Sequence, residues 1–215
     1  MQDLPFRDRV HAGQLLSRKL NAYTDRSNVI VLALPRGGVP VAREVARVLH
    51  AALDVFLVRK LGTPGQEELA MGAIASGGIR VLNDEVVESL HIPPGVIDSV
   101  TTTELRELAR RERLYWGGRP PLHVAGHTVI LVDDGLATGS TMRAAVAALR
   151  QAKPLRIVVA VPIAAAPTCR DLRKEADELV CLHTPEPFYS VGFWYRDFSQ
   201  ASDEEIREML EPEKV

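Results

Sequence analysis

The segment from Val129 to Thr141 reads VILVDDGLATGST, in which four apolar residues run directly into two aspartates and then into small and hydroxylated residues. An apolar strand of this kind is typical of a parallel sheet that helices cover on both faces. Because ligands of open α/β sheets bind beyond the carboxyl ends of the strands, Asp133 and Asp134 should lie at a binding edge. A buried pair of like charges is costly, so these carboxylates should face solvent, a cation or hydroxyl donors.

The loop after the aspartates favours an anion site. Gly135 and Gly139 permit unusual backbone angles, and Ala137 allows a ligand to approach closely. Three side chains supply hydroxyls: Thr138, Ser140 and Thr141. The following segment has a helical pattern, so free backbone N–H groups and the positive end of a helix dipole converge there. The carboxylates could bind the vicinal hydroxyls of a sugar, and the adjacent loop could bind a phosphate. Together they predict a site for ribose 5-phosphate. The plainer alternative is a strand-to-helix turn with a Ser or Thr cap.

Five apolar segments, including this one, alternate with amphipathic segments. Strands are predicted at 29–34, 53–58, 128–132, 156–161 and 178–183. Helices are predicted between them at 39–50, 140–152 and 166–176. This alternation implies right-handed βαβ units. The predicted fold is therefore α/β, a doubly wound and mostly parallel sheet with helices on both faces, in one domain over residues 1–215 with a core at about 28–182.

Two regions interrupt the alternation. Residues 61–83 begin with a Gly/Pro-rich polar stretch, which predicts a mobile loop, and continue with two short strand-like pieces around Gly77-Gly78, which predict a hairpin. Residues 96–116 predict a long charged helix between a Pro pair and a Gly pair. Its Glu and Arg residues alternate and largely cancel, which favours a solvated face over a nucleic-acid site.

A second candidate anion site lies in ALPRGGVPVA. Gly37 and Gly38 expose backbone N–H groups where a helix starts, and Arg36 adds a fork of donors suited to phosphate oxygens. Arg59 and Lys60, at the end of the second predicted strand, should reach the same edge of the sheet. A tight turn with a solvated arginine, and a solvated strand end, are the alternatives. Beside the first motif, both features favour diphosphate binding.

Composition limits the partners. The chain of 215 residues has a formal net charge of −2, so it has no overall attraction to nucleic acid or to anionic membranes. We see no apolar segment with the length of a signal-peptide core or of a membrane span. Cys169 and Cys181 lack CxxC spacing and should be free thiols in a reducing compartment. A cytoplasmic protein that binds neither nucleic acid nor membrane is expected.

The VDDGLATGST segment resembles the signature of the type I phosphoribosyltransferases, which bind 5-phosphoribosyl 1-diphosphate. The resemblance to stand-alone bacterial members of this family extends through LPRGGVPVA, VRK and VGFWYRDF to nearly the whole chain. It implies that Asp133 and Asp134 hold the ribose hydroxyls and that residues 137–141 hold the 5-phosphate. It also implies a non-proline cis peptide at Arg36–Gly37 or its neighbour, in the loop that binds diphosphate.

The resemblance further implies a cofactor and a lid. Mg²⁺ would be held mainly through substrate oxygens, because the sequence has no compact metal motif. The family's flexible catalytic loop corresponds to residues 61–69, but Thr63–Leu69 contains no basic residue and carries Glu67 and Glu68. Arg59 and Lys60 would then have to supply the positive charge of that loop.

The acceptor would be recognised by a hood formed by about residues 1–22 and 183–200. The second segment is rich in aromatic residues, which could stack a flat ring, anchor the tail or form a homodimer interface. Phe188 and Tyr189 are the candidates for ligand contact. The predicted function is displacement of diphosphate by a nitrogenous acceptor such as a nucleobase. The alternatives are a non-catalytic regulator that binds the donor or a nucleotide, and a hydrolase that uses water as the acceptor.

Overall fold

A computed structural model describes residues 4–211, so the first three residues of the predicted hood lie outside the described residues. Five parallel strands form the main sheet, in the order β2-β1-β6-β7-β8. Their bounds are β1 Val29–Ala33, β2 Ala52–Val55, β6 Thr128–Val132, β7 Arg156–Ile163 and β8 Glu178–His183. This arrangement confirms the predicted parallel α/β sheet.

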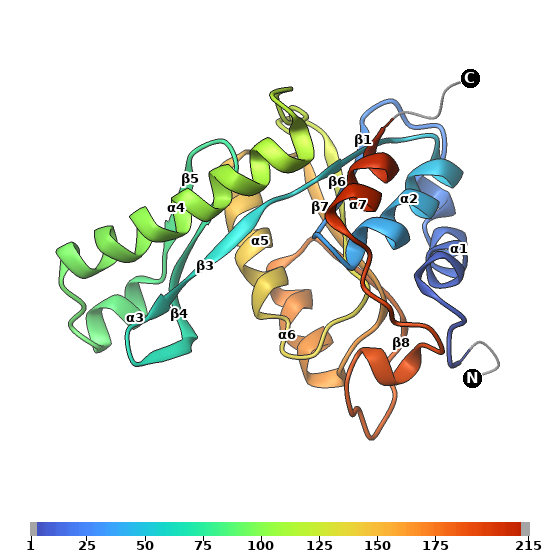
Figure 1. The fold of residues 1–215 in the computed structure, drawn as a ribbon. Coiled ribbons are helices and arrows are strands. Elements are labelled where there is room, and N and C mark those ends of the chain that lie inside the picture. The colour runs from blue at the N-terminus through green and yellow to red at the C-terminus, as the bar shows by residue number, and fades with distance from the viewer. Residues whose placement is uncertain (1–3, 212–215) are drawn as a thin grey trace.

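Helices cover both faces of this sheet, as Figure 1 shows. The helices are α1 Arg9–Lys19, α2 Gly38–Leu49, α5 Ser140–Gln151, α6 Ala166–Glu175 and α7 Asp203–Leu210. Alternate residues of each strand enter two separate cores: Ile130 and Val132 pack with α1 and α2, whereas Val129 and Leu131 pack with α5 and α6. Burial on both faces explains why the strands are apolar throughout.

The second predicted strand, 53–58, is wrong as a single element. Phe56 N still donates to Ala33 O of β1, but from Val58 onward the chain pairs with Ala75 in a different sheet. That sheet is antiparallel, in the order β3-β4-β5, and its strands are β3 Val58–Thr63, β4 Gln66–Ala75 and β5 Ile79–Leu82. An apolar run looks the same in either sheet, so the sequence pattern conceals the change of direction.

The antiparallel sheet also corrects the predicted loop. Residues 61–69 lie mostly in β3 and β4, which leaves a turn at Pro64-Gly65 in place of a mobile loop. The predicted hairpin around Gly77 and Gly78 is confirmed, since both residues have positive φ in the turn between β4 and β5. The side chains of Glu67 and Glu68 lie outside the description. The insertion is thus a β-arm that projects from the core (Figure 1).

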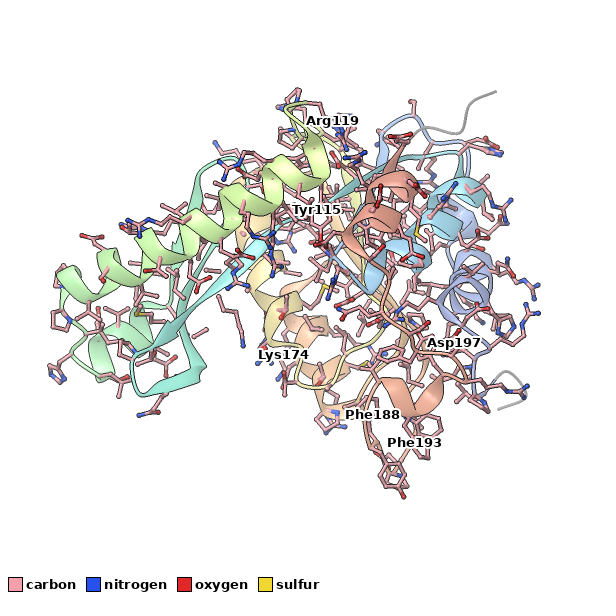
Figure 2. All side chains as sticks on the ribbon, viewed as in Figure 1. Tyr115, Arg119, Lys174, Phe188, Phe193 and Asp197 are labelled. Carbon is pink, nitrogen blue, oxygen red and sulfur yellow. The ribbon has the colours of Figure 1, made fainter. Side chains whose placement is uncertain are left out.

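The long charged helix is confirmed as α4, Pro94–Trp116, and follows the short α3, Asp84–Ser89. It lies along the β-arm and ends at Gly117, whose φ of 57° is left-handed. Asp54 of β2, which is fully buried, ties this end to the core. Its carboxylate accepts from Trp116 Nε1 at 2.9 Å and from both terminal nitrogens of Arg119 at 2.8 and 2.9 Å. Figure 2 marks Arg119 at this corner.

The two predicted hood segments lie side by side. Phe6 N donates to Trp194 O, and Arg196 N donates to Phe6 O, each at 2.8 Å. Two short 3₁₀ turns, Asn21–Tyr23 and Gly192–Trp194, belong to these regions. Cys169 and Cys181 are free thiols, as expected. Within residues 4–211, no helix combines the length and apolar character needed to cross a membrane.

Candidate active site

Asp133 and Asp134 follow β6 directly, at the carboxyl edge of the main sheet. Asp133 Oδ1 accepts a hydrogen bond from Asp134 N at 2.8 Å, which fixes the first carboxylate beside the turn. Burial raises the pKa of the Asp133 carboxyl well above its usual range, and the neighbouring Asp134 carboxylate adds to the effect. Burial also raises the pKa of Asp134, although the Arg9 guanidinium opposes it. The pair is therefore held in a site where negative charge is costly without a partner.

That partner is Arg9 of α1, which the sequence analysis did not identify. Arg9 Nε donates to Asp134 Oδ2 at 2.8 Å, and the side chains are only 10% and 13% exposed. A terminal nitrogen of Arg9 donates to Ser199 O at 2.7 Å, and the guanidinium lies 3.9 Å from the centre of the Phe198 ring. Tyr195 Oη donates to Asp134 O at 2.6 Å. Both hood segments thus converge on the second aspartate.

The predicted phosphate loop, residues 135–141, packs against α6 and the predicted hood. Thr168 Oγ1 donates to Ala137 O, and a Cβ on Gly135 would collide with Val191. Gly139 has a φ of +70° and directly precedes α5, a geometry that suits glycine. Thr138 and Thr141 are exposed. The first N–H groups of a helix have no intrahelical partner, although Ser140 N donates to Thr138 Oγ1 at 3.4 Å. Anion binding by this loop stays a prediction.

The diphosphate loop, residues 35–38, lies against the aspartate pair because β1 and β6 are neighbours in the sheet. The Pro35–Arg36 peptide bond is cis. It is the neighbour of Arg36–Gly37, so it lies within the expected position of a non-proline cis peptide. A Cβ on Gly37 would collide with the Asp134 carboxylate, and one on Gly38 would lie 2.7 Å from Val132 O. The two glycines therefore allow residues 37–38 to pack directly on the end of β6 and the aspartate pair.

A cavity of about 230 Å³ joins these loops to the β-arm. It is lined by Pro35 of the diphosphate loop, Thr141 of the phosphate loop, and Arg59, Lys60 and Arg111. Arg59 and Lys60 belong to β3 of the arm, so their predicted place at the end of a main-sheet strand is wrong, although they do reach the same edge. Lys60 Nζ lies 3.3 Å from Ser140 Oγ, at the start of α5. The charged residues that line the cavity are thus all cations, and the lining includes a residue of each candidate anion site.

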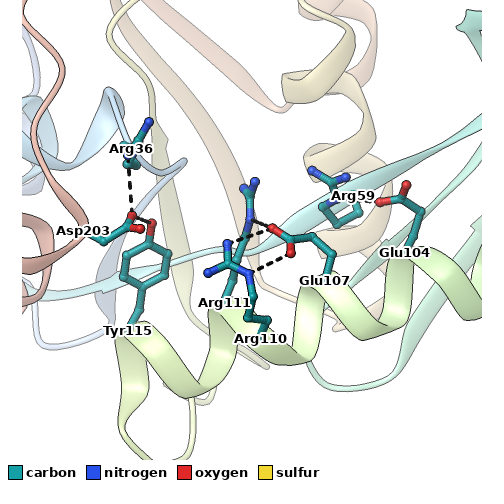
Figure 3. A network of polar contacts seen from close by, with 8 residues as sticks. All are labelled: Arg36, Arg59, Glu104, Glu107, Arg110, Arg111, Tyr115 and Asp203. Carbon is teal, nitrogen blue, oxygen red and sulfur yellow. Dashed lines mark hydrogen bonds and ion pairs between the residues drawn. The ribbon is translucent and has the colours of Figure 1, made fainter.

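Arg36 lies beside a polar network that Figure 3 draws. One of its terminal nitrogens is 3.8 Å from Asp203 Oδ1, which also accepts from Tyr115 Oη at 2.7 Å. Burial and this hydrogen bond raise the pKa of Tyr115, so the phenol stays a donor. Asp203 begins α7 and Tyr115 lies in α4, hence the C-terminal helix and the long helix meet behind the diphosphate loop.

The structure does not bring Phe188 and Tyr189 to the cavity. Phe188 packs in a small apolar cluster with Phe6 and Tyr195. Tyr189 is 66% exposed and its ring lies 4.9 Å from that of Phe193. Figure 2 places Phe188 and Phe193 at the outer end of the molecule, far from Tyr115. Contact of Phe188 and Tyr189 with an acceptor stays a prediction.

A glycine substitution tests the close approach of Gly37 to Asp134. Gly37 has a φ of −59°, so alanine is allowed by the backbone and any effect of Gly37→Ala comes from the collision with Asp134. We expect a loss of about 1–3 kcal/mol in the free energy of unfolding, measured by urea denaturation. Gly95→Ala is the matched control, because nothing lies within 4 Å of its added Cβ. Equal stability of both variants would contradict the close approach.

An open parallel sheet covered by helices on both faces, with two loops and an aspartate pair at its carboxyl edge, defines a doubly wound α/β protein. A family model described as the phosphoribosyl transferase domain matches residues 9–193, and the chain belongs to this family. The resemblance stated from the sequence is thereby confirmed.

Three relatives place the chain more closely. Rv0571c of Mycobacterium tuberculosis, provisionally named a phosphoribosyl transferase, is 46% identical over 206 residues, which are 96% of this chain and 46% of that protein. The chain therefore spans about half the length of that relative. TT1426 of Thermus thermophilus, a crystal structure, is 42% identical with a TM-score of 0.88 and covers 95% of this chain and 97% of its own. Bifunctional protein PyrR of Deinococcus deserti is 29% identical over 76% of this chain and 97% of its own length.

Proposed function

We propose that this chain is a phosphoribosyltransferase that uses 5-phosphoribosyl 1-diphosphate as its donor and a nitrogenous acceptor, with nucleobases the first class to test. The observation that carries the proposal is the close approach of residues 37–38 to Asp133 and Asp134, beside a cavity that is lined by Pro35, Arg59, Lys60 and Thr141. The aspartates accept hydrogen bonds from the ribose hydroxyls. Backbone amides and hydroxyls at 137–141 bind the 5-phosphate.

The reaction exchanges one bond at the anomeric carbon. The acceptor nitrogen forms a bond to C1, the bond from C1 to the diphosphate oxygen breaks, and the electron pair leaves with the diphosphate while the nitrogen releases its proton. Positive charge develops on the ribose and negative charge on the leaving group. Arg36, Arg59 and Lys60, with the amide of Gly37, stabilise the leaving diphosphate. The amide of Gly38, which the sequence predicts to be exposed, instead donates to Leu34 O at 3.0 Å.

The oxygen donors of the site fit Mg²⁺, which prefers carboxylate, phosphate and water ligands. Among residues 4–211 there is no group of three or more His, Cys, Asp or Glu side chains placed to hold a metal. This donor set suits an ion that would arrive with its substrate and be held mainly through substrate oxygens, with Asp133, the carboxylate of the pair that Arg9 does not bind, as the protein ligand. Mg²⁺ bound in this way would supply charge neutralisation for the leaving diphosphate.

A non-catalytic regulator that binds the donor or a nucleotide is the second candidate. Two observations favour it. Arg9 already neutralises Asp134, and residues 63–69 contain no lysine or arginine that could close over a reacting centre. The near-neutral net charge disfavours a regulator that binds RNA.

One assay separates the two candidates. The protein is incubated with 5-phosphoribosyl 1-diphosphate, Mg²⁺ and a panel of nucleobases and other nitrogenous acceptors, and diphosphate release is followed. Release that depends on one acceptor supports the transferase. Release without any acceptor indicates hydrolysis. Donor binding by calorimetry with no release across the panel supports the regulator, and absence of donor binding rejects both.

The raised pKa values predict an unusual pH dependence. Ribose 5-phosphate should bind to the ionised aspartates, so its affinity should fall as the pH is lowered through the raised pKa of the pair, above the usual value of about 3.9. Folding stability has the opposite sign. A carboxyl with a raised pKa in the folded state contributes fully below its unfolded pKa, and that contribution is lost as the pH rises through the folded pKa.

Calorimetry of ribose 5-phosphate binding between about pH 4 and pH 8 measures this dependence. The ligand's own phosphate titrates near pH 6. The wild type is therefore compared with Asp133→Asn, in which the ligand and Asp134 still titrate but Asp133 no longer does. Identical pH profiles for the two proteins would show that Asp133 does not titrate in this range.

A further inference from the structure

Arg111 of α4 lines the cationic cavity, yet it belongs to neither loop and to no motif. From sequence it is one of several arginines on a charged helix. We propose that Arg111 is a further diphosphate-binding residue, so that the rigid helix α4, in place of a mobile loop, completes the wall around the leaving group. The inference rests on the proposed function of the site.

The geometry of the arginines supports this role. Arg111 Nε donates to Glu107 Oε1 at 2.8 Å, and Arg59 Nε donates to Glu104 Oε2 at 2.6 Å. Each guanidinium is thus anchored through Nε to a glutamate of α4, and its terminal amino groups can bind the oxygens of a ligand. In Figure 3 the guanidinium of Arg111 extends away from the axis of α4, on the side where Arg36 and Arg59 also lie. A guanidinium fork suits a phosphate group.

Glu107, the carboxylate that binds Arg111, is ionised at neutral pH. Hydrogen bonds from Arg110 and then from Arg111 hold the pKa of Glu107 at about 2, so the carboxylate stays ionised. A cavity of about 230 Å³ is also far larger than the roughly 10–15 Å³ that one water needs. The cavity that Arg111 and Pro35 help to line therefore has room for a phosphoryl group.

The plain alternative is that Arg111 forms an ordinary helical ion pair, which contributes little. Arg110 supplies the comparison on the same helix. Arg110 binds Glu107 through both Nε, at 2.8 Å, and a terminal nitrogen, at 3.0 Å, and does not line the cavity. Its side chain is 55% exposed, whereas that of Arg111 is 32% exposed. Arg110 therefore satisfies Glu107 with two hydrogen bonds even without Arg111. Of these two arginines, Arg111 alone lines the cavity.

The test measures binding of two probes, inorganic diphosphate with Mg²⁺ and ribose 5-phosphate, to the full chain by calorimetry. Arg111→Ala should weaken diphosphate binding by about 10- to 100-fold and leave ribose 5-phosphate binding within about two-fold, because the 5-phosphate lies at the other loop. Arg111→Lys should recover part of the loss, since it keeps the charge without the fork. Arg110→Ala should bind both probes like the wild type.

Three outcomes overturn the inference. Arg111→Ala could bind diphosphate as the wild type does, it could weaken both probes equally, or Arg110→Ala could cause the same loss. In each case the proposed function stands as long as the wild type binds both probes. A wild type that binds neither diphosphate nor ribose 5-phosphate rejects the proposed function itself, and the inference with it.

Discussion

Asp134→Asn should weaken binding of 5-phosphoribosyl 1-diphosphate on the order of 100-fold, because hydrogen bonds to a charged group contribute about 1.5–3 kcal/mol. The asparagine keeps the shape of the side chain but loses the negative charge of the carboxylate that would accept hydrogen bonds from the ribose hydroxyls. It also leaves Arg9 without its carboxylate, so some stability is lost. Calorimetry measures the dissociation constant, and circular dichroism verifies that the variant is folded under the same conditions.

A matched control uses an aspartate away from the site. Asp171 lies on α6, is exposed and pairs with Lys174. Asp171→Asn should bind the donor like the wild type. Unchanged donor affinity in Asp134→Asn would remove this aspartate from the ribose site and leave Asp133 as the one carboxylate of the pair to hold the hydroxyls.

Arg9→Ala should lower the free energy of unfolding by about 3 kcal/mol, since it leaves a nearly buried carboxylate without its ion-pair partner. The loss also includes the contacts of the guanidinium with Ser199 O and the Phe198 ring. Urea denaturation followed by circular dichroism measures it. Arg18→Ala, at an exposed position near the end of the same helix, is the control and should change stability by no more than about 0.5 kcal/mol.

The double variant Arg9→Ala/Asp134→Asn separates stability from binding. Removing both charges should be less destabilising than the sum of the single changes, because neither charge is then left buried alone. Donor binding should stay weak, since the carboxylate is still missing. A double variant whose stability loss equals that sum would show that Arg9 and Asp134 do not interact energetically.

Much of the candidate site could be predicted because its signals are local in the chain. Each signal occupies a short segment of the chain: the strand before Asp133, the glycines at 37, 38, 135 and 139, and the hydroxyl groups of residues 138–141. The meeting of the two loops also followed from sequence, since loops after parallel strands share one edge of the sheet. The structure places Gly37 and Gly38 directly against the aspartate pair, and one residue of each loop, Pro35 and Thr141, lines the same cavity.

The sequence by itself determined the parallel sheet and the two loops at its carboxyl edge, because apolar runs, glycines and helix starts have consequences within a few residues. Only the tertiary structure decided where the chain leaves that sheet after Phe56, and which side chains far apart in sequence complete the site. Arg9 reaches Asp134 across 125 residues, and Arg111 faces the cavity from a helix that reads as solvated. Such contacts depend on the packing of whole helices and strands, and no periodicity within one segment records them.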